Sequence, residues 1–156
     1  KRMVREYDSV SICLSKGLGT PVGSVLVGSR RFIALAHRWR KTFGGGMRQA
    51  GILASAGLYA LDNNIERLSE DHIRARNLAE AVNRLEKFSV DLDAVQSNMV
   101  YISVPYKQAK QTIEALSSHG VDTIEIGDSI IRAVTHLHIT DEDIERAISA
   151  FSSIRI

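Results

Sequence analysis

A single lysine stands where an apolar run meets a turn rich in glycine and proline, within residues 11–24 (SICLSKGLGTPVGS). The apolar residues before Lys16 predict a strand, and the glycines and proline after it predict a sharp bend. Lysine is rarely buried without a reason. Lys16 is therefore paired with a carboxylate, solvated at a strand end, or used as a nucleophilic amine in a pocket of low dielectric.

Length and composition predict an ordinary globular protein. With 156 residues, 44% hydrophobic and 24% charged, the chain suits one domain or slightly more. Its formal net charge of +2 is too small to argue for nucleic acid or an acidic membrane as a partner. We expect no signal peptide within this stretch, and no apolar run in it approaches the roughly 20 residues of a membrane span. The single cysteine, Cys13, excludes an internal disulfide and favours a reducing, cytoplasmic location.

The predicted elements are strand, strand, helix, helix, long helix, strand, helix, two strands and helix. Their ranges, in chain order, are 8–14, 24–28, 30–41, 47–61, 65–88, 98–104, 106–119, 123–126, 130–134 and 141–152. The first strands are too uniformly apolar for clean alternation, which is typical of strands covered on both faces. We expect the second half to be a compact α+β unit. We expect the first half to be part of a larger α/β layer whose other strands are missing.

Three consecutive glycines, Gly44, Gly45 and Gly46, precede Arg48 at the predicted start of a helix. Bare backbone amides at a helix start, with an arginine in the first turn, suit a phosphate or a carboxylate. A flexible hinge between two helices explains the same residues. Lys41 adds positive charge nearby, although a lysine at a helix C-terminus is ordinarily exposed.

Arg132 is a second candidate for binding an anion, because it lies within an apolar predicted strand. It either grips a carboxylate with two parallel hydrogen bonds or faces water on an edge strand. His136 and His138 would share one face of a strand, but no third ligand stands nearby, so we predict no metal site. Lys16 does not fit a nucleotide phosphate loop, because its glycines follow the lysine instead of preceding it.

Three motifs together resemble the C-terminal half of the threonine aldolase family, which belongs to the fold type I (aspartate-aminotransferase-like) pyridoxal-phosphate enzymes. They are DSVSICLSKGLGTPVGS at residues 8–24, RWRKTFGGGMRQ at 38–49 and IRAVTHL at 131–137. The resemblance covers nearly the whole chain. It implies an α/β fold with the C-terminal part of the cofactor-binding large domain over residues 1–64. A connecting part of a long helix over 65–76 and a small α+β domain over 77–156 would follow.

The resemblance also implies an activity and the residues that carry it. The family cleaves β-hydroxy-α-amino acids such as L-threonine and L-allo-threonine to glycine and an aldehyde. Lys16 would form the Schiff base with pyridoxal 5'-phosphate, and Arg132 would bind the substrate α-carboxylate. Arg48 and the three glycines would lie near a cofactor phosphate, of the same or a neighbouring subunit. Lys41 would be a further active-site cation.

The N-terminal half of the family's pattern is absent from this chain. With it go the acidic partner of the pyridine nitrogen, the ring-stacking histidine and most phosphate contacts. We therefore expect the chain to be a fragment that is inactive alone and that needs the missing half, a homo-oligomer, or both. The alternatives are another fold type I enzyme similar to serine hydroxymethyltransferase, and a non-enzymatic α+β interaction module. The nearly all-apolar run 50–61 indicates a large interface.

Overall fold

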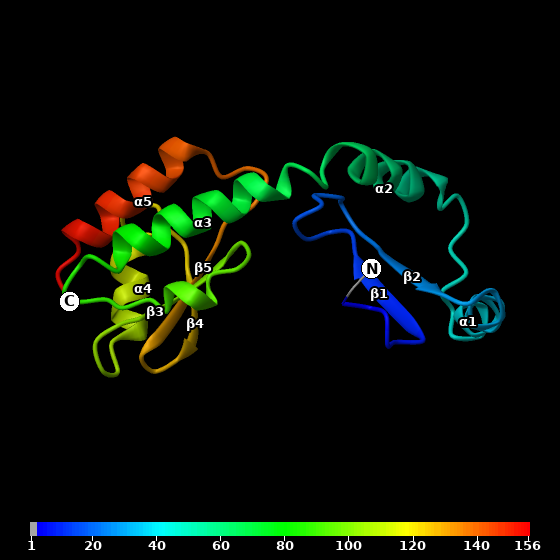
Figure 1. Ribbon diagram of the computed structural model, residues 1–156, viewed down its shortest axis with the longest axis horizontal. Helices are drawn as coiled ribbons and strands as arrows, with labels where there is room; N and C mark the ends of the chain where they lie inside the picture. The colour runs from blue at the N-terminus through cyan, green and yellow to red at the C-terminus, as the bar shows by residue number, and fades with distance from the viewer. Residues whose placement is uncertain (1–2) are drawn as a thin grey trace. The chain divides into compact units, whose positions relative to one another are not determined.

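The computed structural model describes residues 3–156 and divides into two compact units. The N-terminal unit ends at Glu66 and the C-terminal unit begins at Arg67. Each unit has its own sheet, with two strands in the first and three in the second (Figure 1).

An antiparallel hairpin begins the N-terminal unit. Strand β1 (Ser9–Cys13) pairs with strand β2 (Ser24–Gly28). The backbone N–H of Leu14 donates to the carbonyl of Gly23 at 2.9 Å, and Gly23 has a φ of +122°, which glycine adopts without strain. A link this short and rich in glycine favours an antiparallel partner, and that is the pairing the structure has.

Two helices follow the hairpin, α1 (Arg30–Thr42) and α2 (Gly51–Asn63). A serine directly before a helix is a favoured N-cap, and Ser29 caps α1: its Oγ accepts a hydrogen bond from the backbone N–H of Phe32 at 3.2 Å. The prediction that α2 starts at residue 47 or 48 is wrong. Gln49 has a φ of +52°, outside the right-handed helical region, so residues 44–50 form an irregular connection.

Several apolar side chains of the two hairpin strands are exposed. Ile12 of β1 is 44% exposed and Leu26 of β2 is 43% exposed. In this chain, therefore, the two strands are not covered on both faces as predicted. The reason is that the described sheet has two strands and the unit buries few large apolar side chains.

The C-terminal unit is a three-stranded antiparallel sheet with helices. The strand order is β3-β5-β4. Its elements are α3 (Leu68–Val82), the short 3₁₀ helix η1 (Leu92–Ala94), β3 (Met99–Ser103), α4 (Ala109–Ser117), β4 (Ile124–Gly127), β5 (Ile130–Val134) and α5 (Asp141–Ser153). Helix α3 is shorter than the helix predicted at 65–88. The side chain of Asn83 accepts a hydrogen bond from the Val90 N–H at 2.8 Å, which accompanies the turn of the chain after Val82.

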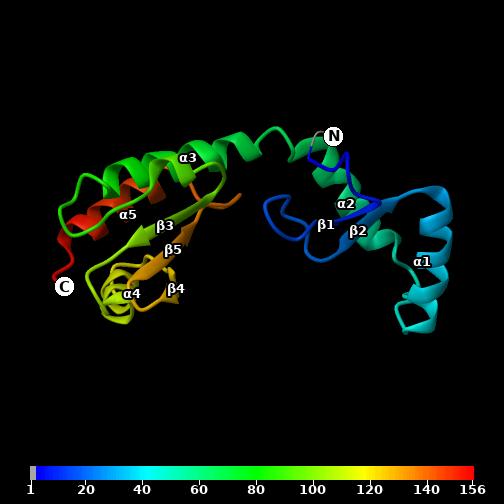
Figure 2. The ribbon, with the colours of Figure 1, turned by 60° about the horizontal axis from the view of Figure 1, so that its bottom comes forward.

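The hydrophobic core of this unit lies on one face of its sheet. Every second residue of β3 and β5 is buried, namely Val100, Ile102, Ile131 and Ala133. Helices α3 and α5 lie side by side over this face (Figure 2), and α4 contributes Ala109 and Leu116 to the same core. The opposite face, which carries Arg132, is left uncovered by these helices. The fold thereby presents Arg132 on an open sheet surface.

A capping box starts α5, and its sequence pattern is Thr140 followed three residues later by the acidic Asp143. Thr140 Oγ1 accepts from the backbone N–H of Asp143 at 3.2 Å, and the Asp143 carboxylate accepts from the Thr140 N–H at 2.9 Å. The hydrogen bonds from Thr140, with a smaller contribution from Arg146, hold the pKa of Asp143 below its ordinary value. This stabilisation is present above the ordinary carboxyl pKa and is lost as the pH falls through the lowered value.

We expect Thr140→Ala to lower the free energy of unfolding by about 1 kcal/mol, because one N-terminal N–H of α5 loses its acceptor. Denaturant titration followed by circular dichroism measures this. Ser149→Ala is the matched control, since the Ser149 hydroxyl only donates to Glu145 within the same helix. Equal losses in the two variants would show that the cap contributes nothing.

Candidate functional site

Lys16 lies in the loop that joins β1 to β2. The carbonyl of Lys16 accepts from the N–H of Gly19 at 2.9 Å, so a tight turn follows the lysine. Leu14, two residues before Lys16, is buried against Gly57 of α2, where an added Cβ would come within 3.2 Å of the leucine side chain. The side-chain amide of Asn64 donates to the carbonyl of Leu18 at 2.8 Å. Packing and hydrogen bonding therefore hold both sides of the turn to α2 and its end.

The side chain of Lys16 itself is exposed, although Leu14 just before it is buried. No carboxylate among residues 3–156 forms an ion pair with it. Free cysteine is usually buried as a small apolar residue, but Cys13 is exposed as well. Its Sγ lies 3.4 Å from Ser15 Oγ, and hydrogen bonding to Ser15 lowers the pKa of the thiol. Lys16 thus offers an accessible, unpaired amine at a well-anchored turn.

The triglycine loop, Gly44, Gly45 and Gly46, folds back on the end of α1. Gly44 has a φ of +83°. A Cβ on Gly45 would lie 2.9 Å from Arg40 Cγ, and a Cβ on Gly46 would lie 2.7 Å from Lys41 Cδ. Such distances exclude a larger residue unless the neighbouring side chains move. The glycines therefore allow Arg40 and Lys41 to lie directly against the loop backbone.

The surroundings of the triglycine loop are strongly basic. Between residues 9 and 61 the chain has no Asp or Glu but seven basic residues, Lys16, Arg30, Arg31, Arg38, Arg40, Lys41 and Arg48. A hollow of about 510 Å³ beside the loop is lined by His37, Arg38, Arg40, Lys41, Thr42 and Gly46. Its charge and its exposed backbone suit an anion such as a phosphate group.

Arg48 does not occupy the first turn of a helix, which corrects the geometry expected from the sequence. It precedes α2 by three residues and is exposed. Any contribution of Arg48 to an anion site therefore comes from its side chain and from loop amides, not from a helix N-terminus.

Arg132 lies on the central strand of the C-terminal sheet, opposite Tyr101 on β3 and Ile124 on β4. Its Nε is buried and has no hydrogen-bond partner among the described residues. A buried, unpaired N–H of a charged group is costly, so this guanidinium suits an anionic partner. Large side chains on the same face are themselves exposed, so this face is open to a ligand; they are Met99, Tyr101, Ile124, Ile130 and Val134. The central position also excludes the interpretation of Arg132 as an edge-strand residue.

The structure brings Lys41 and the triglycine loop together within the N-terminal unit, which also contains Lys16 and Arg48. Arg132 belongs to the C-terminal unit. His136 and His138 lie in a turn after β5 instead of sharing a strand face, with ring centroids 5.8 Å apart. Within residues 3–156, no group of three or more His, Cys, Asp or Glu side chains could hold a metal ion.

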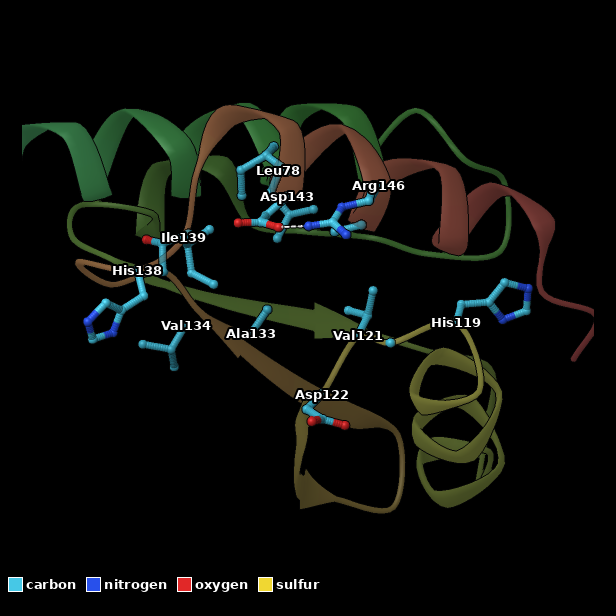
Figure 3. A pocket seen from close by; sticks show the side chains of 14 residues that line it. Leu78, His119, Val121, Asp122, Ala133, Val134, His138, Ile139, Asp143 and Arg146 are labelled. Atoms are coloured by element: carbon cyan, nitrogen blue, oxygen red, sulfur yellow. Dashed lines mark hydrogen bonds and ion pairs between the residues drawn. The ribbon is translucent and has the colours of Figure 1, made fainter.

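A cavity of about 410 Å³ in the C-terminal unit was not expected from the sequence. Its apolar wall includes Leu78, Val121 and Ala133, and Asp122 and Arg146 stand at its margins (Figure 3). Arg132 is not among its lining residues. The lining comes from α3, β5, α5 and the loop after α4, so no local sequence pattern could have revealed it.

Comparison with known proteins assigns the family. Residues 1–105 match the family described as "Beta-eliminating lyase", which is more than half of the chain. The chain belongs to the beta-eliminating lyase family. The match includes Lys16, the triglycine loop and Arg48, all within the N-terminal unit.

Relatives of this beta-eliminating lyase chain match it along nearly its whole length. A "Probable low-specificity L-threonine aldolase 2" of Arabidopsis thaliana is 47% identical over 157 residues, covering 99% of this chain and 44% of the relative. A "Low specificity L-threonine aldolase" of Escherichia coli K12 is 46% identical over 144 residues, covering 92% of this chain and 42% of the relative. The chain thus spans less than half the length of these curated relatives.

Solved structures confirm the predicted α/β fold of a fold type I enzyme. A putative L-allo-threonine aldolase from Listeria monocytogenes superposes with a TM-score of 0.72 at 19% identity, covering 92% of this chain and 44% of that chain. A structure of SPT with PLP superposes with a TM-score of 0.70 at 19% identity, covering 94% of this chain and 39% of that chain. At this identity the likeness concerns the fold alone. None of the helices in residues 3–156 combines the length and the apolar character needed to cross a bilayer.

Proposed function

We propose that the chain is the C-terminal part of a pyridoxal-phosphate-dependent threonine aldolase. The reaction is the cleavage of L-threonine and L-allo-threonine to glycine and an aldehyde. The observation that carries this proposal is the 46–47% identity, across both units, to proteins named low-specificity threonine aldolases in a plant and a bacterium. The membership in the beta-eliminating lyase family supports the same class of chemistry.

The N-terminal unit fits the proposed cofactor. The exposed amine of Lys16 has no ion pair within the described residues, so it is available to hold the aldehyde group of pyridoxal phosphate. Arg48 and the amides of the triglycine loop would hold the phosphate, in a stretch of the sequence that has basic residues but no Asp or Glu between residues 9 and 61. When bound, pyridoxal phosphate supplies the electron sink for breaking the Cα–Cβ bond.

Arg132 has the proposed role of binding the substrate. Its guanidinium would donate two hydrogen bonds to the α-carboxylate, which gives the buried Nε–H an acceptor and orients the amino acid. Lys41 would add a second positive charge toward the substrate.

The partners follow from the exposed apolar surface of the N-terminal unit. Hairpin side chains such as Ile12 and Leu26, and helix side chains such as Trp39 and Leu58, are more than 40% exposed. We propose that the remaining part of the protein, together with further copies in a dimer or tetramer, covers this surface. A cytoplasmic location completes the proposal and agrees with the single cysteine.

The full-length protein, supplied with pyridoxal phosphate, should release glycine and acetaldehyde from both L-threonine and L-allo-threonine. A coupled alcohol dehydrogenase assay measures the aldehyde. The 156-residue chain alone should give none, because the other groups that hold the cofactor ring are outside it. The proposed reaction is wrong if the loaded full-length protein cleaves neither isomer, and the fragment proposal is wrong if the chain alone is active.

A further inference from the structure

A buried network joins the first turn of α3 to the end of β5. The Asp71 carboxylate is 1% exposed and receives two hydrogen bonds from Arg67, from Nη2 at 2.7 Å and from Nη1 at 3.0 Å. The backbone carbonyl of Asp71 accepts from the hydroxyl of Thr135 at 2.7 Å. Thr135 lies 64 residues further along the chain and is also buried.

Asn98, the residue just before β3, is hydrogen-bonded to Thr135 in both directions. The N–H of Thr135 donates to the carbonyl of Asn98 at 3.0 Å, and the side-chain amide of Asn98 donates to the carbonyl of Thr135 at 2.7 Å. These two bonds extend the pairing of β3 and β5 by one residue beyond Met99 and Val134. The end of β5 is therefore fixed both to the sheet and to the helix.

The network compensates for a weak helix start. Helix α3 has no side chain that caps its N-terminus. Glu70 and Asp71 place negative charge in the first turn, where it interacts favourably with the helix dipole. Arg67 is the residue at which the C-terminal unit begins. The network thus fixes the entry of the chain into this unit.

Its position links the network to Arg132. Thr135 follows Arg132 by three residues on the same chain segment, directly after β5 ends at Val134. A shift of Thr135 displaces the end of the strand on which the guanidinium is mounted. A buried ion pair is often no better for stability than apolar residues of similar size, so stability alone does not account for this arrangement.

We propose that Asp71 and Thr135 are positioning residues for Arg132, a role that rests on the proposed binding of the substrate carboxylate by that arginine. They hold the end of β5 against α3, so the guanidinium meets the carboxylate without rearrangement. Arg67 acts through Asp71, because it neutralises the buried carboxylate and fixes the first turn of α3. None of these three residues touches the substrate.

The test uses the full-length, cofactor-loaded protein with Thr135→Val and Asp71→Asn. Glu80→Gln is the matched control, because Arg76–Glu80 is a second i,i+4 pair on α3, without a bond to β5. Binding of glycine and of ethylamine, which has no carboxylate, is titrated through the cofactor absorbance. We expect glycine affinity to fall about 10-fold in Thr135→Val, which loses the hydrogen bond to the Asp71 carbonyl. The fall should be smaller in Asp71→Asn, which keeps that backbone bond and loses the charge that pairs with Arg67. Ethylamine affinity should stay unchanged, and the control should match wild type for both ligands.

Amide hydrogen exchange in β5 of the cofactor-free protein provides a readout independent of function. Exchange at residues 131–134 should accelerate in both variants and not in the control. Equal losses for glycine and ethylamine, or unchanged glycine affinity despite faster exchange, would overturn the positioning role. If wild-type protein binds no glycine, the proposed function fails. The exchange rates then still decide whether the network holds β5, and unchanged rates overturn the inference.

Discussion

Replacing Lys16 with alanine should lower kcat for threonine cleavage by the full-length protein by roughly 10⁴-fold or more, the scale seen when an enzyme loses its nucleophile. The structure leaves the Lys16 amine exposed and without an ion pair among the described residues, so its loss breaks no stabilising contact. The variant should therefore unfold at the same temperature as wild type when both are free of cofactor.

Reductive labelling separates this role from a general effect on folding. Borohydride reduction in the presence of pyridoxal phosphate should attach the cofactor to Lys16, which mass spectrometry of the tryptic peptides detects. Lys110→Ala, an exposed lysine of α4, is the matched control and should keep both activity and label. Equal labelling of wild type and Lys16→Ala would show that another amine holds the cofactor.

Arg132→Leu is expected to lower kcat/KM for threonine about 10²–10⁴-fold, because two hydrogen bonds to a charged carboxylate, each about 1.5–3 kcal/mol, are lost. Most of the change should appear in KM, since the carboxylate is bound in both the ground state and the transition state. Steady-state kinetics with L-threonine and L-allo-threonine measure both constants.

Arg132→Lys should recover part of the loss, because lysine keeps the charge but not the two-point geometry. Arg155→Leu, an exposed arginine near the end of the chain, is the matched control and should leave the kinetics unchanged. An Arg132→Leu variant with the KM of wild type would contradict the proposal that Arg132 binds the substrate carboxylate.

Local rules predicted much of the fold correctly. The hairpin, the Ser29 cap, the Thr140 capping box and the two strands flanking residues 127–129 depend on neighbours within a few residues. Several helix ends were predicted wrongly: α2, α3 and α4 begin later than expected, and α3 also ends earlier. The left-handed backbone of Gln49 delays α2, and the chain turns at Asn83 after α3.

The candidate site was predictable in its residue types but not in its surroundings. The chemistry of an amine, a basic glycine loop and an arginine in a strand is visible in the sequence. The exposure of Lys16 could not be predicted from the sequence, because burial of a strand depends on which other strands cover it. The unpaired Nε of Arg132 was not visible either, since it results from cross-strand neighbours 8 to 31 residues away, Ile124 and Tyr101.

By itself, the sequence determined the order of elements, their caps, the lysine after β1 and the absence of acidic residues around the glycine loop. Only the tertiary structure decided that Asp71 is buried with Arg67 and bonded to Thr135, and that Arg132 stands on the uncovered face of the sheet. The reason is physical. Caps and turns are set by hydrogen bonds between near neighbours, whereas burial and network partners arise when segments more than 60 residues apart pack together.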